Sequence, residues 1–464
     1  MLKKYIGSKQ FYKSALTVAV PIMIQNGITN FVSLLDNIMV GAVGTVEMAG
    51  VSIVNTLLFV FNLAVFGAVS GAGIFTAQYF GKNDHEGVRH TFRYKLLCCA
   101  LLVVAGAAVF LLFGENLISF YLRGKGDAAS IAASLKVGTR YLRIMLLGIP
   151  AIGLVQSYAG TLRETGETAI PMKAGIAAVL VNLLFNYLLV FGKLGMPKLG
   201  ADGAAIATVL SRYVEAGIIM LWTHLHPEKN EFIKGAYRSM KLPPELAKNI
   251  TKKTIPLLLN ETLWALGQAI LTQCYSFRGY DVVSATNICS TIVNVCNVAV
   301  LAMGSSIGII VGQLLGAGKT EEAVDTDRKM IAFSVFVCIL FSGILAGVSG
   351  VFPKLYNTSG EIRSLATTLI LISACLMPID AFANAAYFTL RSGGKTLITF
   401  LFDSFYAMVI VSPLAFALSR FTAIPIVSLY LITQAVQFGK CIIGFVMIRR
   451  GMWVQNIVNN EAEI

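Results

Sequence analysis

Long apolar stretches alternate with short polar connections along almost the whole chain. A hydrocarbon core about 30 Å thick needs roughly 20 residues of α-helix to cross it, and apolar runs of that length recur from residue 15 onward. Glycine, proline and charged residues mark where each run stops. The pattern predicts twelve membrane-spanning helices, at residues 15–40, 50–79, 93–113, 136–161, 169–191, 202–223, 253–277, 284–314, 329–351, 364–389, 396–418 and 424–447.

The composition supports a membrane protein and argues against other classes. Only 13% of the 464 residues are charged and 56% are hydrophobic, whereas a soluble domain has about 25% charged residues. The net charge of +13 comes from scattered basic residues without a basic stripe, so no nucleic-acid partner is expected. The eight cysteines lie inside apolar runs, and the four histidines have no metal or nucleophile spacing. Neither an enzyme nor a cofactor is therefore expected.

Every second connection between the predicted helices is rich in lysine and arginine. These connections include the N-terminal segment 1–14, the linker 224–252 and the C-terminal segment 448–464, and we count Lys95 and Lys440 on the same side. The first apolar run continues for a full span after four lysines, so it does not resemble a cleaved signal peptide. By the positive-inside rule, both termini are predicted to be cytoplasmic.

The first half of the chain, 15–223, is repeated in the second half, 253–447. A shift of 235 residues aligns identical residues in the first two helices of each half, and a shift of 228 does so near the fourth and fifth: Pro21 with Pro256, Asn62 with Asn297, Gln78 with Gln313, Gly81 with Gly316, Pro150 with Pro378, and Arg163 with Arg391. Because six is an even number, both copies insert with the same orientation. Parallel repeats of this kind predict an all-α transporter with two six-helix lobes around a central cavity. A channel is less favoured, because no segment resembles a carbonyl filter.

Asp36, Glu261 and Asp380 lie inside predicted helices, and no basic residue lies within four positions of any of them. An ionised side chain at the bilayer centre costs about 2.5–3.5 kcal/mol on insertion scales, so each one indicates a functional site. Such a carboxylate must face water, bind a cation or carry a proton. The alternative is a neutral, hydrogen-bonded structural acid, an interpretation that fits Asp403 better than Asp36. Arg212 and Glu215, three residues apart on one helix, are expected to neutralise each other.

Several segments resemble the multidrug and toxic compound extrusion (MATE) family. They are Pro21, the segment LLDNIMVG at 34–41, MAGVS at 48–52, AQYFG at 77–81 and GAAIAT at 203–208. The resemblance extends over nearly the whole chain and is similar to the bacterial NorM-like branch. It implies a monomeric antiporter of the bacterial inner membrane that exports amphipathic, often cationic organic compounds in exchange for H⁺ or Na⁺.

The same resemblance implies two ion-coupling sites. The first comprises Asp36, Asn182, Asn186 and Thr208, and the second comprises Glu261 and Asp380. One carboxylate with three neutral oxygens suits Na⁺, while a lone carboxylate in a partly dry site suits H⁺, and Na⁺ is possible at either site. The asparagines, spaced i and i+4, also fit a role in joining helices. Pro21 is expected to weaken the first helix, because it lacks a backbone donor.

Aromatic residues, a methionine and a glutamine are candidates for the substrate cavity, through stacking and cation–π contacts. They are Gln78, Tyr158, Tyr187, Trp264, Met303 and Phe382. Packing or lipid contact is the alternative for each. Two other functions remain open, namely a flippase for lipid-linked oligosaccharides and a non-transporting receptor or scaffold. The acidic central charges argue against the first, and the unpaired carboxylates argue against the second.

Overall fold

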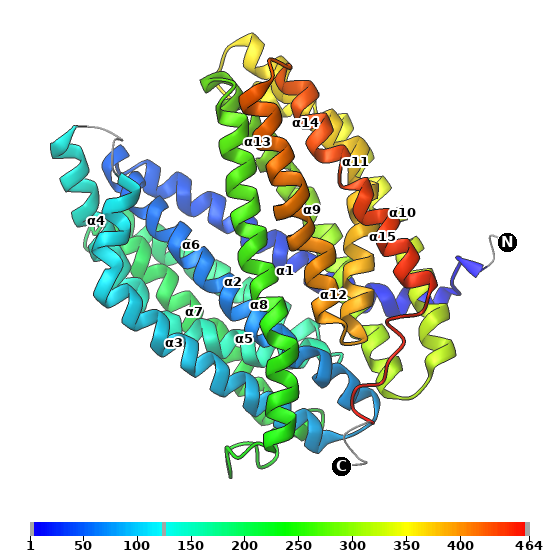
Figure 1. The fold of residues 1–464 in the computed structure, drawn as a ribbon. Helices are drawn as coiled ribbons and strands as arrows, with labels where there is room; N and C mark the ends of the chain where they lie inside the picture. The colour runs from blue at the N-terminus through cyan, green and yellow to red at the C-terminus, as the bar shows by residue number, and fades with distance from the viewer. Residues whose placement is uncertain (1–3, 123–126, 460–464) are drawn as a thin grey trace. The chain divides into compact units, whose positions relative to one another are not determined.

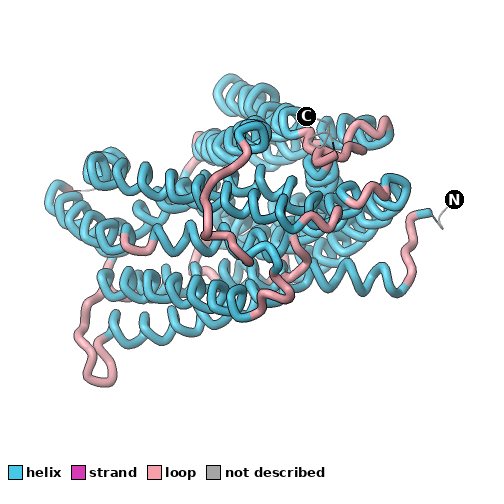
Figure 2. The backbone as a smooth tube through the Cα atoms, turned by 90° about the horizontal axis from the view of Figure 1, so that it is seen from below, coloured by secondary structure: helices cyan, strands magenta, loops and turns pink. Residues whose placement is uncertain are grey.

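The computed structural model describes residues 4–122 and 127–459, without the side chains of 32–35 and 37–38. In the described chain, every regular element is a helix, and short loops join the helices (Figure 2). The all-helical fold predicted from the apolar runs is confirmed.

The described residues of the first half form seven α-helices, labelled in Figure 1, and a short 3₁₀ helix follows them. These elements are α1 (Lys9–Gly41), α2 (Thr45–Gly81), α3 (His85–Leu122), α4 (Ala128–Leu146), α5 (Ile149–Glu164), α6 (Ala169–Phe191), α7 (Ala201–Leu225) and η2 (Glu231–Ile233).

In the second half, the residues up to 459 form the remaining α-helices, one 3₁₀ helix and two π-helical turns. These elements are α8 (Pro244–Ser276), α9 (Tyr280–Gly316), α10 (Thr320–Val348), η3 (Phe352–Leu355), α11 (Gly360–Ser392), α12 (Thr396–Phe400), η4 (Leu401–Phe405), η5 (Ala407–Val411), α13 (Ser412–Phe421), α14 (Ile426–Ala435) and α15 (Phe438–Arg449).

Nine helical stretches in the described chain are long and apolar enough to cross a membrane, and the bent pair α4 and α5 makes a tenth. Together with α1 and α8, which do not pass that test, they correspond to the twelve predicted helices. The pair α4 and α5 was predicted as one helix but bends by 47°. Gly148 and Pro150 account for the break, because proline lacks an amide donor and is favoured in the first turn of a new helix.

Several helices begin before their apolar run. α3 begins at His85 rather than at residue 93, and α10 begins at Thr320 rather than at 329. α8 begins at Pro244, where the missing N–H of a first-turn proline costs no hydrogen bond. Apolarity therefore located the spans, but their polar extensions continue as helix.

The chain forms two compact units. The first unit contains Ile24–Thr76 and His85–Lys248, and the second unit contains Met1–Met23, Ala77–Asp84 and Asn249–Ile464. Two residues after Pro21, helix α1 thus leaves one unit and enters the other.

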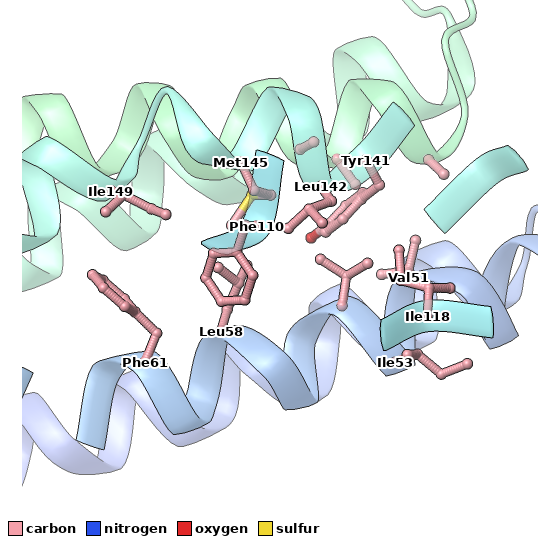
Figure 3. Packing of buried hydrophobic residues seen from close by; sticks show 14 of the residues in the cluster. Val51, Ile53, Leu58, Phe61, Phe110, Ile118, Tyr141, Leu142, Met145 and Ile149 are labelled. Atoms are coloured by element: carbon pink, nitrogen blue, oxygen red, sulfur yellow. The ribbon is translucent and has the colours of Figure 1, made fainter. Parts of the chain in front are cut away.

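An apolar core holds α2, α3 and α4 together within the first unit. Leu58 and Phe61 from α2 meet Phe110 from α3 and Met145 from α4 (Figure 3). The rings of Phe61 and Phe110 pack edge to face with centroids 6.2 Å apart, a geometry that aromatic pairs prefer. This core supports the polar side chains that α6 and α7 carry.

The ends of α2 and α9 contact each other through the repeated residues. A side-chain carbon at Gly81 would overlap the carbonyl of Gln313, and one at Gly316 would overlap the carbonyl of Gln78. Each glycine therefore contacts the glutamine of the other copy, as expected around a local two-fold axis. Only glycine allows two helix backbones to approach this closely.

The C-terminal segment packs onto the same helix ends. Trp453, Ile457 and Val458 are buried. The Asn456 amide donates to the Leu315 and Gly316 carbonyls over 2.9 and 3.3 Å. The segment predicted as a cytoplasmic terminus is therefore part of the packed structure over its described residues.

We expect Gly316→Ala to lower stability by about 1–3 kcal/mol, because the added methyl group must push two backbones apart. Gly343→Ala in α10 is the matched control, since nothing lies within 4 Å of the added carbon there. Thermal unfolding of the two purified variants against the wild type tests this. Equal melting temperatures for both variants would contradict the close approach.

Candidate functional site

Four polar side chains predicted from the sequence form one hydrogen-bonded chain in the first unit. The Asn186 amide donates to the Asp36 carboxylate and also to Asn182 Oδ1, the latter over 3.1 Å. The Asn182 amide donates to Thr208 Oγ1 over 3.2 Å. The structure thus brings together Asp36 of α1, two asparagines of α6 and a threonine of α7.

The local sequence explains this arrangement. Asn182 and Asn186 lie one turn apart on one face of α6 and are both buried. A side-chain carbon at Gly203 would lie 2.7 Å from the Leu189 backbone, so α6 and α7 approach closely there. Small residues at helix contacts are typical of membrane proteins. The GAAIAT segment therefore brings Thr208 within reach of α6.

The amide oxygen of Asn186 is buried and has no hydrogen-bond partner among the residues that the structure describes. Buried polar atoms are rarely left unpaired. An oxygen beside a carboxylate is a suitable ligand for a small cation or for a water molecule. The residues present therefore fit a cation or a proton as a transient occupant.

One arginine contributes charge near this group. Arg212 interacts electrostatically with Asp36, while its guanidinium donates to Glu215 over 2.8 Å. The predicted pair of Arg212 and Glu215 is confirmed. Because Glu215 offsets the positive charge, Asp36 is not itself locked in a direct ion pair.

The second unit contains a different polar network. Lys440 of α15 donates to Asp403 Oδ1 over 2.8 Å, and the Asn260 amide donates to Asp403 Oδ2 over 3.2 Å. Lys440 also interacts electrostatically with Asp380 of α11. The Asn260 amide lies 3.4 Å from the Tyr387 hydroxyl, which continues the network.

Glu261 and Asp380, predicted to share one site, have different charged neighbours. Glu261 interacts with Arg391 and Asp403, whereas Asp380 interacts with Lys440. The two acids are linked only indirectly by these interactions, through Asp403 and Lys440. A shared second-lobe site remains a prediction.

Two lysines counted in cytoplasmic connections lie inside the structure. Lys440 is 7% exposed within α15. Lys95 is completely buried in α3, paired with Glu164 and bonded to Thr161 Oγ1 over 3.1 Å. Both assignments to the connections were wrong, because a buried lysine depends on a carboxylate that is distant in sequence. For Lys440, the position well inside an apolar run already indicated a lysine within a helix.

The cavity candidates divide by exposure. Tyr187 and Trp264 are 50% and 41% exposed, and Phe382 is partly buried. Met303 and Tyr158 are fully buried, and Tyr158 packs edge to face on Phe92. These two residues serve packing in this structure.

Gln78 also has a packing role. Its amide donates to the carbonyls of Ser392 and Gln455 over 3.0 and 3.2 Å, and its oxygen accepts from Ile457 N over 2.8 Å. The side chain is fully buried. The C-terminal segment thus uses the Gln78 amide in this structure, and a place for Gln78 in the substrate cavity remains a prediction.

Comparison with solved structures shows the fold. An outward-facing multidrug resistance MATE family transporter of the MOP superfamily and a MATE protein in complex with MaL6 both superpose with a TM-score of 0.85. In each case the identity is 18% and the match covers 97% of both chains.

Sequence relatives agree with this fold. A probable multidrug resistance protein YoeA of Bacillus subtilis is 23% identical, over 90% of this chain and 89% of its own length. A probable multidrug resistance protein NorM of Thermotoga maritima is 24% identical, over 86% of each chain. The MatE family model matches twice, at residues 21–188 and 256–417, which confirms the internal duplication. With both halves matched, the chain belongs to the MatE family of membrane transporters.

Proposed function

We propose that this protein is an antiporter that exports amphipathic, often cationic organic compounds in exchange for H⁺ or Na⁺. It acts as a monomer in the cytoplasmic membrane, with both termini in the cytoplasm. The observation that carries the proposal is the chain of Asp36, Asn186, Asn182 and Thr208 within membrane helices, in which the Asn186 amide oxygen has no hydrogen-bond partner among the described residues.

Binding of a proton or a metal cation changes the charge of this group. The Asp36 carboxylate accepts a hydrogen bond from the Asn186 amide while it is ionised. Protonation weakens that bond, and a metal cation draws the amide oxygens toward itself instead. Either event alters how α1 is held against α6.

Helix α1 transmits this change. Asp36 lies five residues before the end of α1 at Gly41, and the same helix enters the other compact unit next to Pro21. Proline removes one backbone hydrogen bond, so the helix bends more readily there. A cation at Asp36 can therefore favour one conformation of the transporter, provided that it binds the two conformations with different affinity.

The substrate class rests on the relatives and on the charge of the intramembrane groups. Two relatives carry names that denote probable multidrug resistance. A flippase for lipid-linked oligosaccharides needs free cationic groups for pyrophosphate. Here Arg212 is paired with Glu215, and Lys440 is paired with Asp403. The exposed rings of Tyr187 and Trp264 are suited to flat organic cations.

Reconstituted vesicles test this function. We expect ethidium transport to depend on an imposed pH gradient or Na⁺ gradient and to stop when that gradient is collapsed. One charge moving through 100 mV supplies about 2.3 kcal/mol, enough for roughly a 50-fold gradient of a neutral compound. Separate pH and Na⁺ arms identify the ion. Transport that needs neither gradient, or movement of a pyrophosphate-linked lipid instead of the dye, would refute the proposal.

A further inference from the structure

Lys440 forms an ion pair with one carboxylate in the second unit and interacts electrostatically with another. Its ammonium group lies 2.8 Å from Asp403 Oδ1 and interacts with Asp380. The side chains of Lys440 and Asp403 are 9% and 24% exposed, respectively. The ring centroid of Tyr406 lies 6.0 Å from the ammonium nitrogen, at the limit of a cation–π contact. The ammonium group thus contacts an acidic oxygen of Asp403, the kind of ligand that a metal cation would use.

The backbone on both sides is adapted to this pair. Asp403 lies in η4, the first of two consecutive π-helical turns. Such turns are rare in proteins overall, but where they occur they are often at functional sites. Lys440 follows a tightened turn in which Gly439 N and Lys440 N each bond the carbonyl three residues before. Two facing helices therefore depart from α-geometry where the two side chains meet.

A glycine and a tyrosine fix the approach of these helices. The Tyr406 hydroxyl donates to the Val436 carbonyl over 2.9 Å. A side-chain carbon at Gly439 would overlap that hydroxyl, so a larger residue there would displace the Tyr406 ring. The contact places α15 so that Lys440 reaches Asp403.

We propose that Lys440 determines the ion specificity of the second lobe: its ammonium group is a tethered cation that excludes Na⁺ from Asp403. A tethered group competes at a high effective concentration and cannot diffuse away. Exchange of an external cation is then confined to the site at Asp36. This inference about Lys440 rests on the proposed function and deepens it, but its test measures cation binding and not transport.

The experiment measures melting of purified protein at pH 8.5 in NaCl against equal choline chloride. All variants carry Asp36→Asn, so that the first site does not contribute. The Asp36→Asn protein and its Lys440→Arg derivative should not respond to Na⁺. The Lys440→Met derivative should show a saturable rise of about 2–4 °C in melting temperature, because bound Na⁺ stabilises the folded state. Addition of Asp403→Asn should abolish this rise.

Two results would overturn the inference. One is a Na⁺ response in the Asp36→Asn protein with Lys440 intact that Asp403→Asn removes. The other is a folded Lys440→Met derivative without any Na⁺ response. If that derivative does not fold, Lys440→Gln replaces it, since the amide can still bond Asp403 without a charge, and the same two results decide. Failure of the vesicle assay would leave these binding results unchanged, so the two failures are distinguishable.

Discussion

Asp36→Asn protein should fold like the wild type and lose cation-driven export. Asparagine has the shape of aspartate but carries no exchangeable charge at neutral pH. Asn186, which now donates to Asp36 Oδ1, can still donate to the amide oxygen of the substituted residue. The helix contacts are therefore retained, whereas the coupling step is removed. We expect gradient-driven dye transport in vesicles to fall to the rate of protein-free vesicles.

A matched substitution controls for the change from acid to amide. Glu361→Gln alters an exposed carboxylate in the first turn of α11 and should leave transport unchanged. Asn186→Ala removes the donor to Asp36 and should give a partial loss. Export by Asp36→Asn protein at the wild-type rate under the same gradient would show that Asp36 is a structural residue. Loss of monodisperse protein would instead assign it to folding.

The local pattern of the sequence predicted most of the helices and the first polar group. Each span is long, apolar and stopped by glycine, proline or charge, so it can be recognised without its neighbours. Asn182 and Asn186 share a helix face through their spacing alone. Their meeting with Asp36 and Thr208 followed only from the family resemblance, because spacing within one helix does not show which helices pack together.

The contacts that were missed join residues distant along the chain. Asp403 and Lys440 lie on different helices, and the partner of Lys95 is on α5. A count of basic residues places such a lysine in an aqueous connection, because the carboxylate that stabilises it is distant along the sequence. The buried C-terminal segment was missed for the same reason, since Gln78 and Leu315 supply its partners.

Lys95→Met should be among the most destabilising single substitutions in this chain. The Lys95 side chain is fully enclosed, and its ammonium group is paired with Glu164, which is 15% exposed. Removing one partner of a buried ion pair costs about 3–5 kcal/mol, because the desolvated carboxylate loses the ammonium group that faces it. The expected result is a loss of this size in the free energy of unfolding, measured by SDS titration in mixed micelles.

The double substitution Lys95→Met with Glu164→Met separates the ion pair from simple packing. Replacing both charges by apolar groups of similar volume is often neutral or stabilising, so the double variant should recover at least about half of the lost stability. Glu164→Met alone completes the cycle and should also be destabilised, because it removes the carboxylate paired with the Lys95 ammonium and leaves that ammonium its bond to Thr161. If the double variant is less stable than Lys95→Met, the lysine is held by packing of its methylene groups, and the charge contributes little to the fold.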